Sequence, residues 1–290
     1  MRLNNKITGS LLALLLFSSF AYGQRYISLP FLGGYDEDAT ILLGISYSAG
    51  FSHYALKLNK DWQGSDILPN GEEKDHVLNL KNIRSIASDP RIELNVGIPI
   101  DYRLNDLFYI NIIPSFNFVN EARVEYTGEI SNGDGNFQEK SIQRKGRHAL
   151  NSTIGRNFNN FNLPFDIKYR SEEKVFKGNG WDFRYRGYLL GGVRYTRWLG
   201  IEKEYRDLSA EVRKGHQNQA LVFHKDYYSW EAGVGFDLFF YHFKMSPNIK
   251  YVQSFSNILG SSPELLQGNL FMAPVHSAKS KSIFLTLIFQ

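Results

Sequence analysis

Two of the seven histidines lie beside residues that could join them in hydrolytic chemistry. His53 follows Ser52 directly, and His224 stands two residues before Asp226. A histidine beside a serine or an aspartate can serve acyl transfer, lipid deacylation or proteolysis as a general base. The remaining histidines are His76, His148, His216, His242 and His276. None belongs to a nucleophile motif or to an H-x-x-x-H metal spacing, so we predict neither a catalytic residue nor a metal site, and no enzyme.

Cofactor motifs are also missing from the sequence. The chain has no cysteine, which excludes disulfides, a lipoprotein anchor and any Cys-ligated metal. It has no phosphate-binding glycine loop and no dinucleotide fingerprint. The glycines fall inside apparent strands, where they ease curvature, and we expect no cofactor.

Charged residues of both signs recur at every second position, opposite apolar ones. We expect twelve of them to point into the interior of a closed sheet: Arg91, Glu93, Asp101, Arg103, Asp166, Lys168, Arg186, Arg194, Glu231, Asp237, Lys244 and Lys250. Buried charges must pair with one another or with water, because an unpaired buried charge is very costly.

Period-two alternation defines the elements that would carry these charges. It predicts eight strands, at residues 40–51, 91–103, 108–118, 160–170, 185–196, 228–240, 243–255 and 282–289. A tilted strand needs roughly 9–11 residues to cross a membrane. A soluble β-sandwich alternates in the same way, so alternation alone does not separate the two folds.

Aromatic residues at the ends of the apolar faces favour the membrane fold. They form the pattern of an interfacial girdle. The girdle residues are Tyr47, Phe51, Tyr102, Phe108, Phe118, Tyr169, Tyr195, Tyr228, Phe240, Phe243 and Tyr251, with Tyr185 as a further member of the pattern. We therefore predict an all-β, eight-stranded antiparallel transmembrane barrel of the outer-membrane type.

The links between the predicted strands alternate in length. Links of about 39, 40, 30 and 26 residues alternate with much shorter ones, which places all long loops on one side, as in outer-membrane barrels. The long loops are polar, and we expect them to point outward and to be either functional or disordered. An interior of eight strands is only wide enough for its own side chains, so we expect a charged plug and no transport pore.

The N-terminus predicts export. Arg2 and Lys6 precede a short apolar run at 11–17, and Ala21-Tyr22-Gly23 resembles a cleavage site. An uncleaved anchor is the alternative, although the run is shorter than the roughly 20 residues of a spanning helix. We expect a signal peptide at 1–23, a periplasmic lead-in at 24–39 and the barrel domain at 40–290. Sec-type export would deliver it to the outer membrane of a Gram-negative bacterium.

Overall charge argues against nucleic acid as a partner. The chain has 33 basic and 29 acidic residues, and removal of Arg2 and Lys6 leaves 31 against 29. No basic tract is present, so the sequence pI near 9.0 does not indicate nucleic-acid binding. With 22 Phe, 17 Tyr and 25 Gly, the composition suits a β-protein that has membrane lipid as a partner.

Several short motifs occur in order along the chain. They are Leu29-Pro30, Tyr35-Asp36 and Leu43-Gly44-Ile45, and the segments 162–169 (NLPFDIKY), 188–195 (YLLGGVRY), 231–237 (EAGVGFD) and 243–251 (FKMSPNIKY). In these motifs, from about residue 29 to the end, the chain resembles the PorT family of the Bacteroidetes type IX secretion system, one of the small outer-membrane barrels of that phylum. The chain departs from the family in its longer loops and in Asn248, where Glu is usual.

This resemblance implies a non-enzymatic outer-membrane component of type IX secretion and, in some species, of gliding motility. Its partners would be other secretion-system proteins, and the family supplies no catalytic residues. Two alternatives stay open. One is a free-standing barrel that is structural or binds a ligand through its loops. The other is a lipid-modifying or proteolytic barrel that uses His53 or His224.

Overall fold

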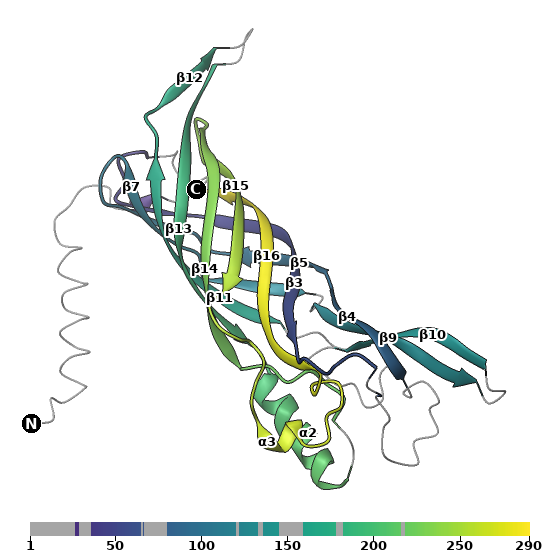
Figure 1. Cartoon of the computed structure of the whole chain (residues 1–290). Helices are drawn as coiled ribbons and strands as arrows, with labels where there is room; N and C mark the ends of the chain where they lie inside the picture. Colours follow the sequence, from purple (N-terminus) through teal and green to yellow (C-terminus); the bar gives the residue numbers. More distant parts are fainter. Residues whose placement is uncertain are drawn as a thin grey trace, which may run out of the picture.

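Most of the described chain belongs to one large β-sheet (Figure 1). The computed structural model describes residues 27–28, 36–64, 66, 80–119, 122–132, 136–144, 159–177, 182–215 and 218–290. The expected signal peptide lies outside these residues, as does most of the expected lead-in. The mainly β architecture agrees with the sequence-based prediction.

Thirteen described strands make up this sheet. They are β1 (Ile27–Ser28), β2 (Ile41–Leu43), β3 (Ile45–Leu58), β5 (Arg91–Gly97), β6 (Ile100–Arg103), β7 (Phe108–Ile112), β8 (Ser115–Val119), β11 (Asn160–Arg170), β12 (Lys174–Lys177), β13 (Asp182–Trp198), β14 (Asp226–Phe239), β15 (Lys244–Ser254) and β16 (Val275–Phe289). No predicted segment extends more than one residue beyond them. The number differs from eight because three segments are interrupted, and because β1 and β12 are additional.

The interruptions have local causes. Pro99 and Pro114 lie in the breaks between β5 and β6 and between β7 and β8, and proline cannot donate a hydrogen bond to a neighbouring strand. The break between β2 and β3 falls at Gly44. A Cβ atom there would lie 1.9 Å from the carbonyl oxygen of Phe289, so only glycine allows this close approach.

The strand pairings form a ring. From β3 they lead to β5, β8, β11 and β13, and then through β14 and β15 to β16. Strand β16 pairs with β3 over most of its length, which returns the series to its start. Each of these pairs is antiparallel, and from β3 to β16 the strands of the ring follow their order in the sequence. The ring leaves its strands with hydrogen-bond partners on both edges.

The two faces of the ring reverse the usual distribution of polarity. Along β11, Asp166, Lys168 and Arg170 are buried, whereas the intervening Ile167 and Tyr169 are 55% and 45% exposed. The same alternation gives large exposed apolar side chains on the other strands of the ring, such as Phe51, Leu94 and Leu285. We call this outer surface the apolar belt. Charge therefore lies inside the ring and hydrocarbon outside it.

The ends of the ring differ (Figure 1). The β6–β7 and β14–β15 turns and β12 lie at one end, which we call the short-link end. At the opposite, long-loop end lie the helices α2 (Ile201–Arg213) and α3 (Pro263–Leu266). A second sheet, of β4 (Lys81–Asp89), β9 (Arg123–Asn132) and β10 (Asn136–Arg144), lies at the same end. Among the helices that the structure describes, none is long and apolar enough to cross a membrane.

The long loops pack around a hydrophobic core of their own, which we call the cap. Its buried members come from β3, β4, β9, β10, α2, α3 and the residues around them, and include Ile83, Tyr126, Leu208, Phe223 and Phe271. Burial raises the pKa of Tyr126 far above its usual value, so its hydroxyl stays protonated and donates to the carbonyl oxygen of Phe271 at 2.6 Å. The described parts of these loops are thus folded and not merely polar connections.

Adjacent glycines of β13 provide a test of the ring packing. A Cβ at Gly192 would lie 2.0 Å from the carbonyl oxygen of Phe165, whereas one at Gly191 would meet nothing nearer than 3.6 Å. We expect Gly192→Ala to lower the free energy of unfolding by about 1–3 kcal/mol, because the added methyl group overpacks against the backbone of β11. We expect Gly191→Ala to leave it nearly unchanged. Urea unfolding of both variants in detergent micelles checks this. Equal midpoints for the two variants would contradict the described β11–β13 contact.

Candidate functional site

Ten charged side chains are buried within the ring, and they constitute its most distinctive site. They are Glu93, Asp101, Asp166, Lys168, Arg170, Arg194, Glu231, Asp237, Lys244 and Lys250. Five are acidic and five are basic, so their formal charges cancel. They come from β5, β6, β11, β13, β14 and β15, and alternation along each strand turns them inward.

One cluster centres on Asp237. Its carboxylate pairs with Lys168 Nζ at 2.8 Å and with Arg170 Nε at 3.0 Å. Ser246 Oγ donates a further hydrogen bond to it at 2.6 Å. Asp101 extends the cluster, since it lies 3.3 Å from Lys244 Nζ and 3.7 Å from Lys168 Nζ. Each carboxylate of the cluster thus contacts two bases, and Lys168 is shared between them.

A second cluster centres on Lys250. Its Nζ lies 2.8 Å from Asp166 and 2.9 Å from Glu231, and Arg194 Nε pairs with Glu231 at 2.5 Å. Asn117 donates to the Glu93 carboxylate at 2.8 Å. Opposite charges thus face one another at short distances away from bulk water, which offsets part of the cost of burying them.

Aromatic rings fill space between the charged groups. Lys168 Nζ lies 3.9 Å from the centre of the Tyr188 ring, and the Arg170 guanidinium lies 4.7 Å from that of Tyr109. Such cation–π contacts add attraction beyond the ion pairs. Long side chains and rings thus occupy the interior, in the arrangement expected for a plug.

Of the twelve charged residues predicted to point inward, the structure buries nine. These are Glu93, Asp101, Asp166, Lys168, Arg194, Glu231, Asp237, Lys244 and Lys250. Arg91, Arg103 and Arg186 lie on the same face as the buried charges of their strands, but they are only partly buried and pair at the ends of the ring. Arg91 pairs with Asp89, Arg103 with Asp106, and Arg186 with Glu37. Alternation fixes which face a residue occupies and not its height along the strand.

Arg170 is the buried charge that the prediction omitted. It is fully buried and contacts Asp237 and Tyr109. The signal was present in the sequence, because Arg170 continues the alternation of Asp166 and Lys168 at the next inward position of β11.

The predicted girdle residues lie on the outer surface, most of them near strand ends, with Phe51 in the middle of β3. Tyr47, Phe51, Tyr102, Phe108, Phe118, Tyr169, Tyr228 and Phe240 are exposed, and Tyr195, Phe243 and Tyr251 are half-buried. They meet in pairs at both ends. Phe108–Tyr169 and Phe240–Phe243 have ring centres 5.2 and 4.8 Å apart at the short-link end, and Tyr195–Tyr228 are 5.4 Å apart at the other.

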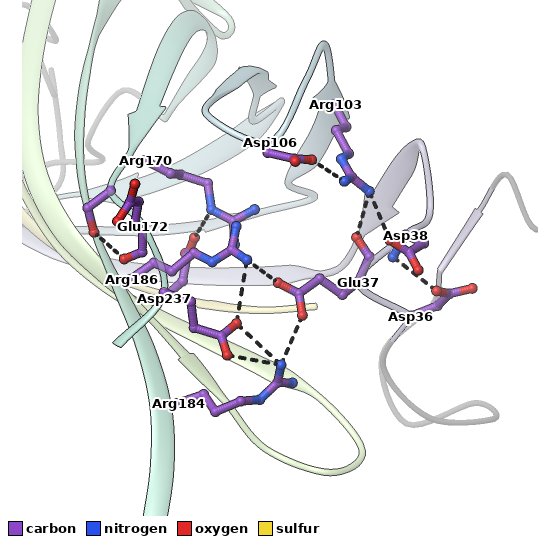
Figure 2. Close-up of polar contacts among 12 residues, drawn as sticks. Asp36, Glu37, Asp38, Arg103, Asp106, Arg170, Glu172, Arg184, Arg186 and Asp237 are labelled. Carbon is purple, nitrogen blue, oxygen red and sulfur yellow. Dashed lines mark hydrogen bonds and ion pairs between the residues drawn. The ribbon is translucent and has the colours of Figure 1, made fainter. Parts of the chain in front are cut away.

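An acidic turn at residues 36–38 covers the short-link end (Figure 2). Glu37 pairs with Arg184 at 3.1 Å and with Arg186 at 2.9 Å, and both arginines belong to β13. Arg103 contacts Asp38 at 3.4 Å and also binds Asp106, whose pKa its hydrogen bond lowers. The turn thereby joins the start of the ring to β6 and β13.

The histidines do not form the dyads that would support catalysis. Ser52 is buried whereas the next residue, His53, is exposed, so their side chains point to opposite faces of β3. His224 is exposed, and the contact described for the Asp226 carboxylate is with the Tyr195 hydroxyl at 3.3 Å. Within the described part of the chain, no group of three or more His, Cys, Asp or Glu could hold a metal ion.

No protein-family model and no curated protein matches the chain. Solved structures that align with it include Ail, the attachment invasion locus protein of Yersinia pestis, at 11% identity and a TM-score of 0.22, covering 85% of this chain and 97% of Ail. The complex of Ail with the heparin analogue sucrose octasulfate gives 12% identity, the same TM-score and the same coverage.

Salmonella typhi OmpF in complex with daunomycin aligns at 10% identity and a TM-score of 0.15, covering 88% of this chain and 100% of OmpF. These three structures are outer-membrane β-barrel proteins. Such low TM-scores do not establish a shared fold.

Substitution of Asp237 tests the interior network. Asp237→Asn leaves Lys168 and Arg170 buried without their carboxylate, and we expect it to lower the free energy of unfolding by about 3–5 kcal/mol. Urea unfolding in micelles measures the loss. Asp106→Asn is the matched control at the solvent-exposed turn, and we expect it to leave the midpoint unchanged. An Asp237→Asn midpoint equal to that of the wild type would contradict the network.

Proposed function

We propose that the chain is an eight-stranded outer-membrane β-barrel with a sealed interior, which acts without catalysis through protein partners at its ends. When the segments broken at Gly44, Pro99 and Pro114 are joined, the ring consists of eight transmembrane spans. On the resemblance to the PorT family, we further propose that it serves type IX protein secretion and, in some hosts, gliding motility. Its location would be the outer membrane of a Gram-negative bacterium, reached by Sec-type export.

The observation that carries this proposal is the reversed polarity of the ring. Exposed apolar side chains such as Phe51, Ile167 and Leu285 would cost heavily in water but suit hydrocarbon. The enclosed charges would be solvated by one another. In lipid, every backbone polar group needs an internal partner, and a ring of strands supplies one.

A filled interior favours an interaction role over transport. A conduit would need a wider ring or a lining of one sign, whereas here five acids and five bases neutralise one another. Substrate transport through the interior would have to break several ion pairs at once. The surfaces left for function are those at the two ends.

The β12–β13 hairpin is the partner-binding surface that we favour at the short-link end (Figure 1). All four residues of β12 are exposed, and Val175 and Phe176 are 52% and 53% exposed. Phe176 stacks on Phe183 of β13 with ring centres 5.1 Å apart. Among the described strands, β12 pairs with β13 alone, so its other edge can accept an extended segment of a partner.

A second candidate is a free-standing barrel that binds a ligand through the cap. The folded core of the cap favours it, because a packed set of loops can hold a binding surface in place. Truncation of the cap that abolishes ligand binding while sparing secretion would support this candidate. The proposal of a lipid-modifying or proteolytic barrel is weaker, since Ser52 and His53 point to opposite faces.

A complementation assay tests the proposed role. In a strain from which the gene is deleted, we expect cargo of the type IX system to be absent from the cell surface and to be restored by the wild-type chain. Val175→Ser with Phe176→Ser should not restore it, because the hairpin loses its exposed apolar surface. The control is Tyr241→Ser, which removes an 87% exposed aromatic from the β14–β15 turn at the same end and should restore delivery.

Both variants should first be shown to accumulate as folded protein, by the change of electrophoretic mobility on heating. Normal cargo delivery in the deletion strain would overturn the secretion role. Full rescue by the hairpin variant would overturn only the assignment of the partner surface.

A further inference from the structure

Four basic side chains lie next to one another on the outer surface of β3 and β16, at the long-loop end. They are His53 and Lys57 of β3 and Lys279 and Lys281 of β16. Lys281 lies directly opposite His53 in the strand register, and Lys279 is opposite Ala55, between His53 and Lys57. We call these four residues the basic ladder. Directly opposed residues have Cβ atoms about 5 Å apart, and diagonal ones about 7–8 Å apart.

The ladder begins where the apolar belt ends. Phe51 and Ile283 lie opposite each other and are 63% and 50% exposed. His53 and Lys281 are the next residues on the same outer face of their strands. Two residues of a strand span about 7 Å, so the ladder starts within one headgroup's depth of the belt. If the belt lies in hydrocarbon, the ladder lies among the lipid headgroups on that side.

No described residue forms an ion pair with the lysines of the basic ladder. Within the described residues, no ion pair involves His53, Lys57, Lys279 or Lys281, and His53, Lys57 and Lys279 are exposed. Asp89, which ends the strand before β5, is already paired with Arg91.

Bases at the corresponding place on the other side of the ring do have a partner. Arg197, two residues beyond the girdle residue Tyr195, pairs with Glu202 at 3.0 Å, and Lys225 lies 3.4 Å from the same carboxylate. The bases of this site therefore differ from the lysines of the ladder in having a carboxylate partner.

Like charges on neighbouring strands are destabilising unless an anion lies between them. Lysine binds phosphate as a flexible point charge and can extend to the headgroup level while its methylene stem stays on the apolar belt. We propose that the basic ladder is a binding site for the phosphate groups of membrane lipid headgroups bordering the long-loop end. This inference rests on the proposed outer-membrane location and adds to it a specific lipid contact.

The test uses the full chain folded in uncharged detergent micelles. It is titrated with a bis-phosphorylated diglucosamine lipid, with the dephosphorylated form of that lipid, and with inorganic phosphate, and the bound lipid is counted by native mass spectrometry. Each basic residue near an anionic surface contributes roughly a fivefold factor in affinity. Because the ladder has several lysines, each with such a factor, we expect the wild type to bind the phosphorylated lipid at least ~10-fold more tightly than the dephosphorylated form.

The variant Lys57→Gln, Lys279→Gln, Lys281→Gln should lose this preference. The control variant Arg197→Gln, Lys225→Gln removes two bases that already have a carboxylate partner, and it should keep the preference. Because all five substitutions are on the surface, both variants should fold, which their mobility shift on heating verifies.

Three results would overturn the inference: a wild type without the preference, a triple variant that retains it, or inorganic phosphate that binds the ladder as strongly as the lipid. If the wild type shows no preference, the ladder would instead be expected to bind another anionic partner, such as an acidic protein. A chain that folds in no micelle or bilayer would instead overturn the proposed membrane barrel, so the two failures are distinguishable.

Discussion

Charge neutrality inside the ring is the constraint on which the other features depend. An alternating strand that presents hydrocarbon outward must present its polar side chains inward. In this chain, those inward positions include five acids and five bases. An isolated charge there would be far more costly than the total stability of a typical domain allows. Contacts such as those of Asp237 with Lys168 and of Lys250 with Glu231 are therefore conditions for the ring to exist.

This constraint also directs function towards the ends of the molecule. Once long side chains fill the interior, little of it remains for a ligand or a path. The sequence not used by the ring forms the acidic turn and the β12–β13 hairpin at one end and the cap at the other. The cap has its own hydrophobic core, which holds its described segments together. The basic ladder lies between the cap and the apolar belt, where the proposed membrane location would bring protein, lipid and water together.

The local sequence contained enough information to predict the strands, but not where each residue lies along the ring or how the loops pack. Alternation predicted the bounds of β11 correctly, because the side chains of a strand with one buried face alternate between polar and apolar at every second position. The same rule applied one position further would have found Arg170. It could not show that Arg103 and Arg186 lie at the end of the ring, since height depends on the tilt and register of neighbouring strands.

The cap could not have been predicted in the same way. Its core combines residues as distant in sequence as Tyr54, Tyr126, Phe223 and Phe271, and none of them belongs to a periodic pattern that spans the cap. Only long-range packing brings them together. The partly apolar content of the loops was visible in the sequence, but the polar and glycine-rich stretches between those residues obscured it. The acidic turn was hidden for a related reason, because its partners are on β6 and β13.

The central claim is a membrane-embedded ring whose interior is sealed by paired charges, and ion conductance tests it most directly. The full chain would be folded into planar lipid bilayers, and its insertion verified by protection of the spans from protease. The account predicts that current under an applied voltage stays at the level of a protein-free bilayer, because no continuous aqueous path crosses the ion-pair clusters. Steady, stepwise single-channel currents from the inserted wild-type protein would contradict it.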